Sequence, residues 1–416
     1  MVVPNPLPEH STDRLDLPFV DDDQTPADAE NNRVAVLLMG YGEVESYEDF
    51  ANYNEQALNL LTAKFAPVPT WIYPPLAKVL AAFDLHEWSH QHGNFISPHN
   101  AIFERQRAGI EAALKQRWGD RIEVFKAFNF CQPHLPEQVL ETIRDRGFSK
   151  LLIYPLLVVD SIFTSGIAIE QVNKALVNLQ TGDTHWVRSM RYIPSFYNQP
   201  DYIQLLARMV QERIDREWRS SFLPSQIGIV LLNHGCPHEA KGFVSGIAES
   251  QALYEAVRVE LMHRYPLISV GWLNHDTPMI NWTQPNAQLA AHNLIELGAQ
   301  AILMMPIGFA TENHETLLDV EHIMLALQRQ HPQVIYQQMP CVNDHPEFLE
   351  MAARWANPLI SDLLGERAKA IHFAGVDRSH LLDQASDSDH AATHSHDHDH
   401  DHAHAGHHHH GHHHHH

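Results

Sequence analysis

Two residues that can move protons and bind metal ions follow apolar segments in the second half of the chain. His234 stands in LLNHGCP, and Glu315 stands in PIGFATENHETLLDVEH. Imidazole and carboxylate groups accept protons near neutral pH, and both are ligands of divalent transition metals. The pair is therefore a candidate for general-base or metal chemistry. A lone histidine at a strand end is more often a partly buried, hydrogen-bonded side chain, so the interpretation needs support from other motifs.

Glu315 also belongs to a line of acidic side chains. Glu312, Glu315, Asp319 and His322 are spaced i, i+3, i+7 and i+10. An α-helix over this stretch would place all four on one face. Such a face is an acidic stripe ending in an imidazole, with Glu315, Asp319 and His322 as candidate metal ligands. A solvated helix face is the equally simple alternative.

The elements that must position these residues occur twice in the chain. The segment VAVLLMGYG at 34–42 is similar to IGIVLLNHG at 227–235. RGFSKLLIYPLL is similar to LGAQAILMMPIG, and IPSFYNQPDYIQLLAR to MPCVNDHPEFLEMAAR, in the same order. An internal repeat of this kind predicts two similar halves. They differ mainly by an insertion of about 40 residues after the first strand.

The apolar segments alternate with amphipathic ones, of which 101–118 and 250–265 show helical spacing. Continuous Val/Ile/Leu strands alternating with helices are typical of parallel sheets covered on both faces. We expect an α/β fold of two similar doubly wound, Rossmann-like domains with an interdomain cleft. The first would span 33–215 and the second, carrying His234 and Glu315, 226–365. Ligands of such folds bind beyond the carboxyl ends of the strands.

Composition narrows the function. The 416 residues include 28 basic and 51 acidic side chains, a net charge of −23 with His neutral, which argues against nucleic acid as a partner. The three cysteines are far apart, so no iron-sulfur cluster is expected and a reducing compartment fits. No apolar run approaches the roughly 20 residues of a membrane helix. The N-terminus lacks the pattern of a secretory signal, and we expect a cytoplasmic protein.

Both ends of the chain lack the pattern of a packed domain. Residues 1–32 are rich in Pro and Asp and predict a flexible leader. Residues 379–416 predict a disordered tail, in which His396, His398, His400 and His402 alternate with Asp. These imidazoles offer exchangeable sites for Ni²⁺, Co²⁺, Zn²⁺ or Cu²⁺. A purification tag is the alternative for the last five histidines, but the irregular DHDHDHAHAGHHHHG before them is not tag-like.

Together, these motifs resemble the ferrochelatase family of the class II chelatase superfamily. The family's acidic segment, G-F-[VA]-x-[DE]-x-x-E-[TV]-L, is matched by Gly308, Phe309, Ala310, Glu312, Glu315, Thr316 and Leu317. Its histidine turn is matched by LLNHG, and further matches are MGYG, ISPHNAIFERQ and VGWLNHDTPMINWTQP. The chain departs from the family at Asn129, where many members have Arg, and at His99, where Leu is usual. The segment around Thr164 and Ser165 is longer than usual.

The resemblance implies an enzyme that inserts Fe²⁺ into a porphyrin and releases two pyrrole protons. His234 and Glu315 would face each other across the cleft, His234 as metal ligand or proton acceptor. Asp319 would continue a route for metal or protons. Fe²⁺ or Co²⁺ would be a substrate, with no tightly bound cofactor. The residues expected to bind the macrocycle are Tyr41, Ser97, Pro98, Thr164, Ser165 and Trp282.

The insertion, about residues 43–105, also fits this function. Its segment 67–95, called the lip below, interleaves Trp71, Tyr73, Leu76, Leu80, Phe83 and Trp88. A flat macrocycle needs such an apolar wall. The resemblance likewise places a substrate-gripping lip here, and the lip is a candidate for peripheral membrane contact. Packing within the insertion is the simpler alternative.

Two other functions stay open. A sirohydrochlorin cobalt or iron chelatase is favoured by Asn129 and by the tail, since related cobalt chelatases of corrin synthesis can carry His-rich stretches. The long insertion favours the porphyrin enzyme instead. A non-catalytic metal or tetrapyrrole binding protein is disfavoured by the presence of both His234 and Glu315.

Overall fold

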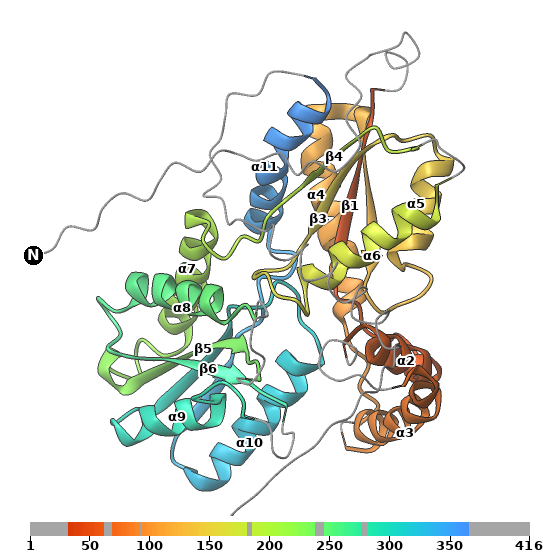
Figure 1. Cartoon of the computed structure of the whole chain (residues 1–416). Helices are drawn as coiled ribbons and strands as arrows, with labels where there is room; N and C mark the ends of the chain where they lie inside the picture. Colours follow the sequence, from red (N-terminus) through yellow and green to blue (C-terminus); the bar gives the residue numbers. More distant parts are fainter. Residues whose placement is uncertain are drawn as a thin grey trace, which may run out of the picture.

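The computed structural model describes residues 32–61, 69–91, 93–180, 185–237, 245–275 and 281–365 (Figure 1). The predicted leader, except for residue 32, and the predicted tail with His396, His398, His400 and His402 lie outside the described residues.

The first half forms a parallel sheet with the strand order β2-β1-β3-β4. The strands are β1 (Val34–Gly40), β2 (Ile122–Phe128), β3 (Lys150–Pro155) and β4 (Ser189–Tyr192). Every residue of β1 is buried, as expected of a central strand covered on both faces. Its alternate side chains enter two different cores, Val36 and Leu38 on one face and Leu37 and Met39 on the other.

The second half repeats this arrangement in the order β6-β5-β7-β8. Its strands are β5 (Ile227–His234), β6 (Leu267–Leu273), β7 (Ala301–Pro306) and β8 (Ile335–Gln338), all parallel. The repeated sequence segments become equivalent elements, β1 with β5 and β3 with β7. The predicted α/β fold with two similar parallel sheets is confirmed.

Helices connect the strands and cover both faces of each sheet. In the first half they are α4 (His99–Trp118), α5 (Pro136–Asp145), α6 (Ser165–Asn178) and α7 (Pro200–Glu217). In the second half they are α8 (Ile247–Leu261), α9 (Ala287–Glu296), α10 (Val320–Gln330) and α11 (Pro346–Leu363). The helices predicted at 101–118 and 250–265 are therefore present, each beginning two or three residues earlier.

The last helix of each half packs on the other half. Helix α11 lies along α4 and the first sheet, whereas α7 lies along α8 (Figure 1). The Tyr154 hydroxyl of β3 donates a hydrogen bond to the carbonyl of Ala352 in α11 at 3.1 Å. The Tyr202 hydroxyl of α7 donates one to the carbonyl of Ile307, just after β7, at 3.2 Å. The two halves thus exchange helices.

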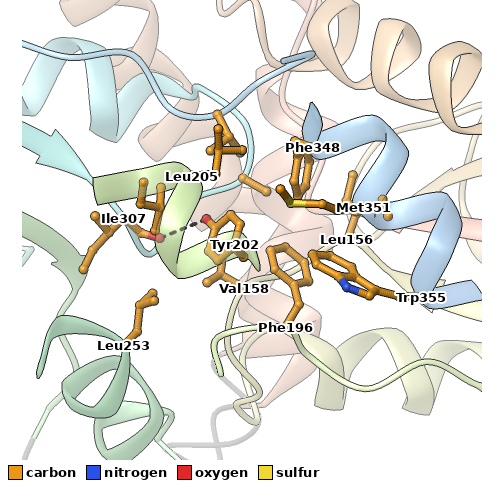
Figure 2. Packing of buried hydrophobic residues seen from close by; sticks show 14 of the residues in the cluster. Leu156, Val158, Phe196, Tyr202, Leu205, Leu253, Ile307, Phe348, Met351 and Trp355 are labelled. Atoms are coloured by element: carbon orange, nitrogen blue, oxygen red, sulfur yellow. Dashed lines mark hydrogen bonds between the residues drawn. The ribbon is translucent and has the colours of Figure 1, made fainter. Parts of the chain in front are cut away.

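One central core joins the halves as a result (Figure 2). The Phe196 and Trp355 rings stack with their centroids 5.1 Å apart, and Phe348 packs beside them. Phe196, Tyr202 and Phe348 are almost completely buried. Removing such large apolar surfaces from water stabilises the packing by roughly 25 cal/mol per Å². This core holds the strand ends of the two halves in a fixed relative position.

The insertion after β1 folds as a helical hairpin (Figure 1). It contains short helical turns at Tyr47–Asp49 (η1) and Thr70–Ile72 (η3), the helices α2 (Phe50–Leu61) and α3 (Tyr73–His86), and a π-helical turn, η4 (Glu87–Gln91). Trp88 is buried against Phe50, their ring centroids 5.0 Å apart, and in the same cluster as Leu318 of the second half. The insertion therefore rests on the segment that follows Glu315.

The predicted apolar wall of the lip is divided between two environments. Tyr73 and Trp88 are buried, whereas Trp71 and Phe83 are 75% and 69% exposed. Leu76, Val79 and Leu80 extend the exposed part along α3. Among the described residues, no helix is long and apolar enough to cross a membrane.

Candidate active site

His234 and Glu315 are in direct contact at the carboxyl ends of adjacent strands. His234 ends β5, and Glu315 begins a π-helical turn, η7 (Glu315–Asp319), after β7. The His234 Nε2 atom lies 3.2 Å from the Glu315 Oε1 atom. Neighbouring parallel strands end at the same edge, which explains how residues 81 positions apart meet. Glu315 is buried, whereas the His234 side chain is 43% exposed and can meet a ligand.

A third side chain that could bind a metal, His275, lies beside them and was missed in the sequence. It follows β6, the other neighbour of β5, and its Nε2 atom lies 3.4 Å from the same Glu315 oxygen. Ligand atoms of His234, His275 and Glu315 all lie within 4.8 Å of one another. The sequence contained a signal for it, because the dipeptide Asn-His stands at the end of β5 and again directly after β6. Gly235 permits the close approach, since a Cβ there would collide with the Asn274 side chain.

The charges of this group are strongly coupled. Burial favours the neutral form of Glu315, but the imidazoles of His234, His275 and His314 outweigh it and hold the pKa of Glu315 well below its usual range. Partial burial opposes the charged form of His234, but the Glu315 carboxylate raises the pKa of His234 above its ordinary value. The Glu315 carboxylate therefore stabilises a proton on His234 when no cation is bound. An incoming cation competes with that proton.

A buried ion pair links the two halves next to Glu315. Glu43, in the loop after β1, is only 4% exposed and forms an ion pair with the His314 Nδ1 atom. Glu43 also accepts hydrogen bonds from the His314 backbone N–H at 3.1 Å and from the Ser97 hydroxyl. Burial opposes the charged imidazole, yet Glu43 raises the pKa of His314 to about 10. The pair positions the start of η7.

His99 adds a second link between the halves. Its Nε2 atom accepts a hydrogen bond from the Gly42 N–H at 3.3 Å, and its Nδ1 atom lies 3.1 Å from the carbonyl oxygen of Glu312. Burial lowers the pKa of His99. A neutral ring that donates from Nδ1 and accepts at Nε2 satisfies both contacts.

The predicted line of acidic residues is only partly present. Glu312 precedes the helix, and its backbone N–H donates to Asn343 Oδ1 at 3.0 Å. The wide π-turn from Glu315 to Asp319 changes the helical register, so the four residues do not share one α-helical face. Burial and the charge of Glu315 raise the pKa of Asp319 to about 7.

His322 is exposed and lies outside the group formed by His234, His275 and Glu315. It lines a hollow of about 620 Å³ between the end of the lip and α10. Other residues lining this hollow are Phe95, Leu317, Leu318, Glu321, Met324, Leu325 and Gln338.

The predicted macrocycle-binding residues are found in different settings. The Trp282 ring lies 5.4 Å from the His275 ring, at the metal-binding group. The Tyr41 ring lies 4.7 Å from Phe130, and burial together with Glu315 and Glu43 raises the pKa of Tyr41. Both aromatic side chains are therefore near the charged residues of the site.

The hydroxyl groups among them face protein atoms. Ser97 is buried and donates to Glu43, and Pro98 follows it immediately before α4. The Thr164 Oγ1 atom accepts a hydrogen bond from the Ser161 N–H at 3.0 Å, and Ser165, the first residue of α6, is fully buried. In this conformation, Ser97 bonds to Glu43 and Thr164 bonds within its own turn, whereas the Ser165 hydroxyl is buried without a hydrogen-bond partner among the described residues.

Fold and site together define a class of protein, an α/β protein whose strand ends bring two imidazoles and a carboxylate close enough to hold one metal ion. The chain belongs to the ferrochelatase family, because the sequence model of that family, Ferrochelatase, matches residues 33–358. It is therefore a metal chelatase, a lyase, and its family acts on a tetrapyrrole and a divalent metal.

Known relatives agree with this assignment. The ferrochelatase of Trichodesmium erythraeum (strain IMS101) is 25% identical over 332 residues, 76% of this chain and 80% of the relative. That of Gloeothece citriformis (strain PCC 7424) is 26% identical over 335 residues, 77% of this chain and 81% of the relative. A solved structure of SirB from Bacillus subtilis with Fe³⁺ covers 80% of this chain and 98% of its own, with 12% identity and a TM-score of 0.46. A likeness that low says nothing about the substrate.

Replacing His275 by Ala is expected to raise the KM for metal about 10–100-fold, with a smaller effect on kcat. The reason is that His275 contributes a ligand atom next to Glu315 but does not share the short contact of His234. Initial rates over a range of metal concentrations give both the KM for metal and kcat. An unchanged KM would show that His275 does not bind the substrate metal.

Proposed function

We propose that this chain is a ferrochelatase that inserts Fe²⁺ into a porphyrin, protoporphyrin IX or coproporphyrin, and forms haem. The observation that carries the proposal is the group formed by His234, His275 and Glu315 in a chain of the ferrochelatase family. Nitrogen and oxygen ligands suit Fe²⁺ and Co²⁺ and release them more readily than thiolates do. A chelatase must release its metal, so this ligand set fits the reaction.

The proton balance gives each residue a role. Insertion exchanges one M²⁺ for the two pyrrole protons of the macrocycle. The neutral form of His234 accepts the two pyrrole protons in turn and gives up the first to solvent before it takes the second, while Glu315 stays negatively charged and stabilises the imidazolium each time. Asp319, with a pKa of about 7, can pass a proton toward solvent at neutral pH. The reaction needs no resident cofactor in this proposal.

The macrocycle would lie against Tyr41, Trp282 and the lip. The Tyr41 and Trp282 rings lie near the charged group, and the insertion packs on η7 through Trp88. Ser97 and Pro98 would bound this surface from the start of α4. Thr164 and Ser165 would take part only after their turn rearranges, because the Thr164 hydroxyl bonds within the turn and Ser165 is completely buried.

The exposed side of the lip gives a second surface. Trp71, Val79 and Phe83 are more than half exposed on and beside α3. We propose that this face makes peripheral contact with a membrane surface, where an apolar product would partition. Co-sedimentation with vesicles should fall on Phe83→Glu, and equal sedimentation of both proteins would count against the contact. The protein itself we place in the cytoplasm, where Cys131, Cys236 and Cys341 would remain free thiols.

A sirohydrochlorin cobalt or iron chelatase is the second candidate, and Asn129 favours it. Asn129 is completely buried at the end of β2, and its Nδ2 atom has no hydrogen-bond partner among the described residues. An amide there cannot pair with a substrate carboxylate as an arginine would. A different set of acidic side chains on the macrocycle would suit this change.

Anaerobic metal insertion, followed by absorbance, separates the candidates. Protoporphyrin IX, coproporphyrin III and sirohydrochlorin are each offered with Fe²⁺ and with Co²⁺. Turnover confined to a porphyrin and Fe²⁺ supports the proposal, whereas a preference for sirohydrochlorin and Co²⁺ would replace it. Binding without turnover on every pair would indicate a binding protein.

The tail is proposed to load or buffer the substrate metal through His396, His398, His400 and His402. Truncation at Asp383 is expected to leave kcat at saturating metal unchanged and to lower activity only when metal is scarce. The measurement is activity at a series of buffered free-metal concentrations. A truncated enzyme that is inactive even in excess metal would refute this role.

A further inference from the structure

A second pair of histidines lies on the outside of the lip. His86 ends α3 and His90 lies in the π-turn η4, within the sequence His-Glu-Trp-Ser-His. Their rings stack with centroids 5.0 Å apart and planes 24° apart, and both side chains are exposed. Histidines four residues apart on one helical face can bind one metal ion together.

The residues between the two histidines are anchored to the active site. Trp88 is buried in a cluster with Leu318 of η7, and its ring lies 5.8 Å from the His314 ring. His314 immediately precedes Glu315. The exposed histidine pair is therefore held at a defined position beside the turn that carries Glu315 and Asp319.

Two carboxylates, Asp84 and Glu87, stand on either side of His86 in the sequence. Glu87 and Asp84 are partly buried, and Asp84 accepts a hydrogen bond from Asn54 Nδ2 at 2.7 Å. Glu87 is close enough to raise the pKa of both Asp84 and Asp319. Oxygen ligands thus continue from the exposed histidines toward Asp319.

This spacing has another use in proteins, as a zinc site whose glutamate acts as a base in peptide hydrolysis. The charge of Glu87 acts here on Asp84 and Asp319, which are carboxyl groups of the protein and not a substrate groove. The arrangement fits the transfer of a cation better than hydrolysis. Two exposed imidazoles also leave most coordination positions to water, so a bound ion can exchange.

We propose that His86 and His90 form an exchangeable site for a divalent transition metal, which passes the ion by way of Glu87 and Asp319 to His234, His275 and Glu315. The site is separate from the tail and from the catalytic group. Its delivery role rests on the proposed function, whereas metal binding by the pair does not.

Binding is tested in the full chain by labelling with diethyl pyrocarbonate, which modifies imidazole nitrogens that carry no metal. Zn²⁺ is set by a metal buffer, and labelling is assigned to each histidine position by tandem mass spectrometry, since His86 and His90 share one tryptic peptide, 79–105. Ions bound elsewhere then do not interfere. Labelling of His86 and of His90 in the parent protein should be at least fivefold lower with Zn²⁺ than without it, and both should respond over the same range of free Zn²⁺. In His90→Ala, this protection of His86 should be lost, because a single imidazole binds far more weakly.

His263, an exposed histidine after α8, is the internal control and should keep its labelling. Unprotected His86 and His90, or protection of His86 that survives His90→Ala, would overturn the proposed site.

Delivery is tested by metal insertion with the double variant His86→Ala/His90→Ala. The KM for metal should rise at least threefold at unchanged kcat, and His263→Ala should have no effect. Protection without any change in KM would overturn delivery while leaving the site. If no variant or parent protein inserts metal, the proposed function fails, and the labelling result stands on its own.

Discussion

Replacing His234 by Ala is expected to lower kcat for metal insertion by about 10²–10⁴-fold, the usual contribution of a positioned general base. The imidazole lies 3.2 Å from Glu315 at the end of β5, where it can accept a pyrrole proton or hold the metal. Macrocycle binding should remain largely intact, because the lip and the aromatic side chains are unchanged. Single-turnover absorbance measures insertion, and quenching of tryptophan fluorescence measures macrocycle binding.

His263→Ala is the matched control and should insert metal at the parental rate. Turnover that survives in His234→Ala would refute the catalytic assignment. The pH profile gives a second readout. Because Glu315 raises the pKa of His234, the parental rate should increase as pH rises through that raised pKa and His234 loses its proton. In Glu315→Gln, the remaining activity should rise at a lower pH.

Replacing Glu43 by Gln is expected to lower the free energy of unfolding by about 2–3 kcal/mol. Breaking a buried ion pair on one side costs roughly 3–5 kcal/mol, and we reduce this because the His314 side chain is 35% exposed and partly screened by solvent. The lost pair also joins the two halves beside Glu315, so insertion activity should fall with stability. Thermal unfolding monitored by circular dichroism measures the change in stability.

The stability lost in Glu43→Gln should depend on pH, because both members of the ion pair titrate. The pKa of His314 is raised from 6.5 to about 10, so its contribution is complete below about pH 6.5 and disappears as pH rises toward 10. The pKa of Glu43 is lowered from 4.5, because its partners outweigh its burial, so its contribution is complete above about pH 4.5 and is lost at lower pH. The difference between parent and Glu43→Gln should be largest between about pH 5 and 6.5 and smaller at pH 9.

Glu45→Gln provides the matched control, because Glu45 lies in the same loop but is exposed. It should change stability by less than about 0.5 kcal/mol. Equal melting temperatures for Glu43→Gln and the parent at pH 6 would show that the pair does not stabilise the fold. A difference that grows toward pH 9 would contradict the assigned ionisation.

The segment η7 shows most clearly which features the local sequence pattern predicts and which depend on tertiary packing. The pattern around Glu315 predicted a helix, and a helix is present from His314 onward. The spacing could not show that its first turn is a wide π-turn, because that depends on packing against Trp88 and on the ion pair with Glu43. Periodicity alone therefore predicted an α-helical face shared by Glu315, Asp319 and His322, and the π-turn removes it.

By itself, the sequence determined the two similar halves, the parallel strands and the positions of His234 and Glu315 after them. These features depend on apolar runs, helical spacing and repeats, all of which are local patterns. Only the tertiary structure decided that α7 and α11 exchange halves, that His275 lies beside His234 and Glu315 and that Glu43 pairs with His314. Such contacts join residues far apart in the chain, and their partners are selected by the packing of the whole core, which no local pattern records.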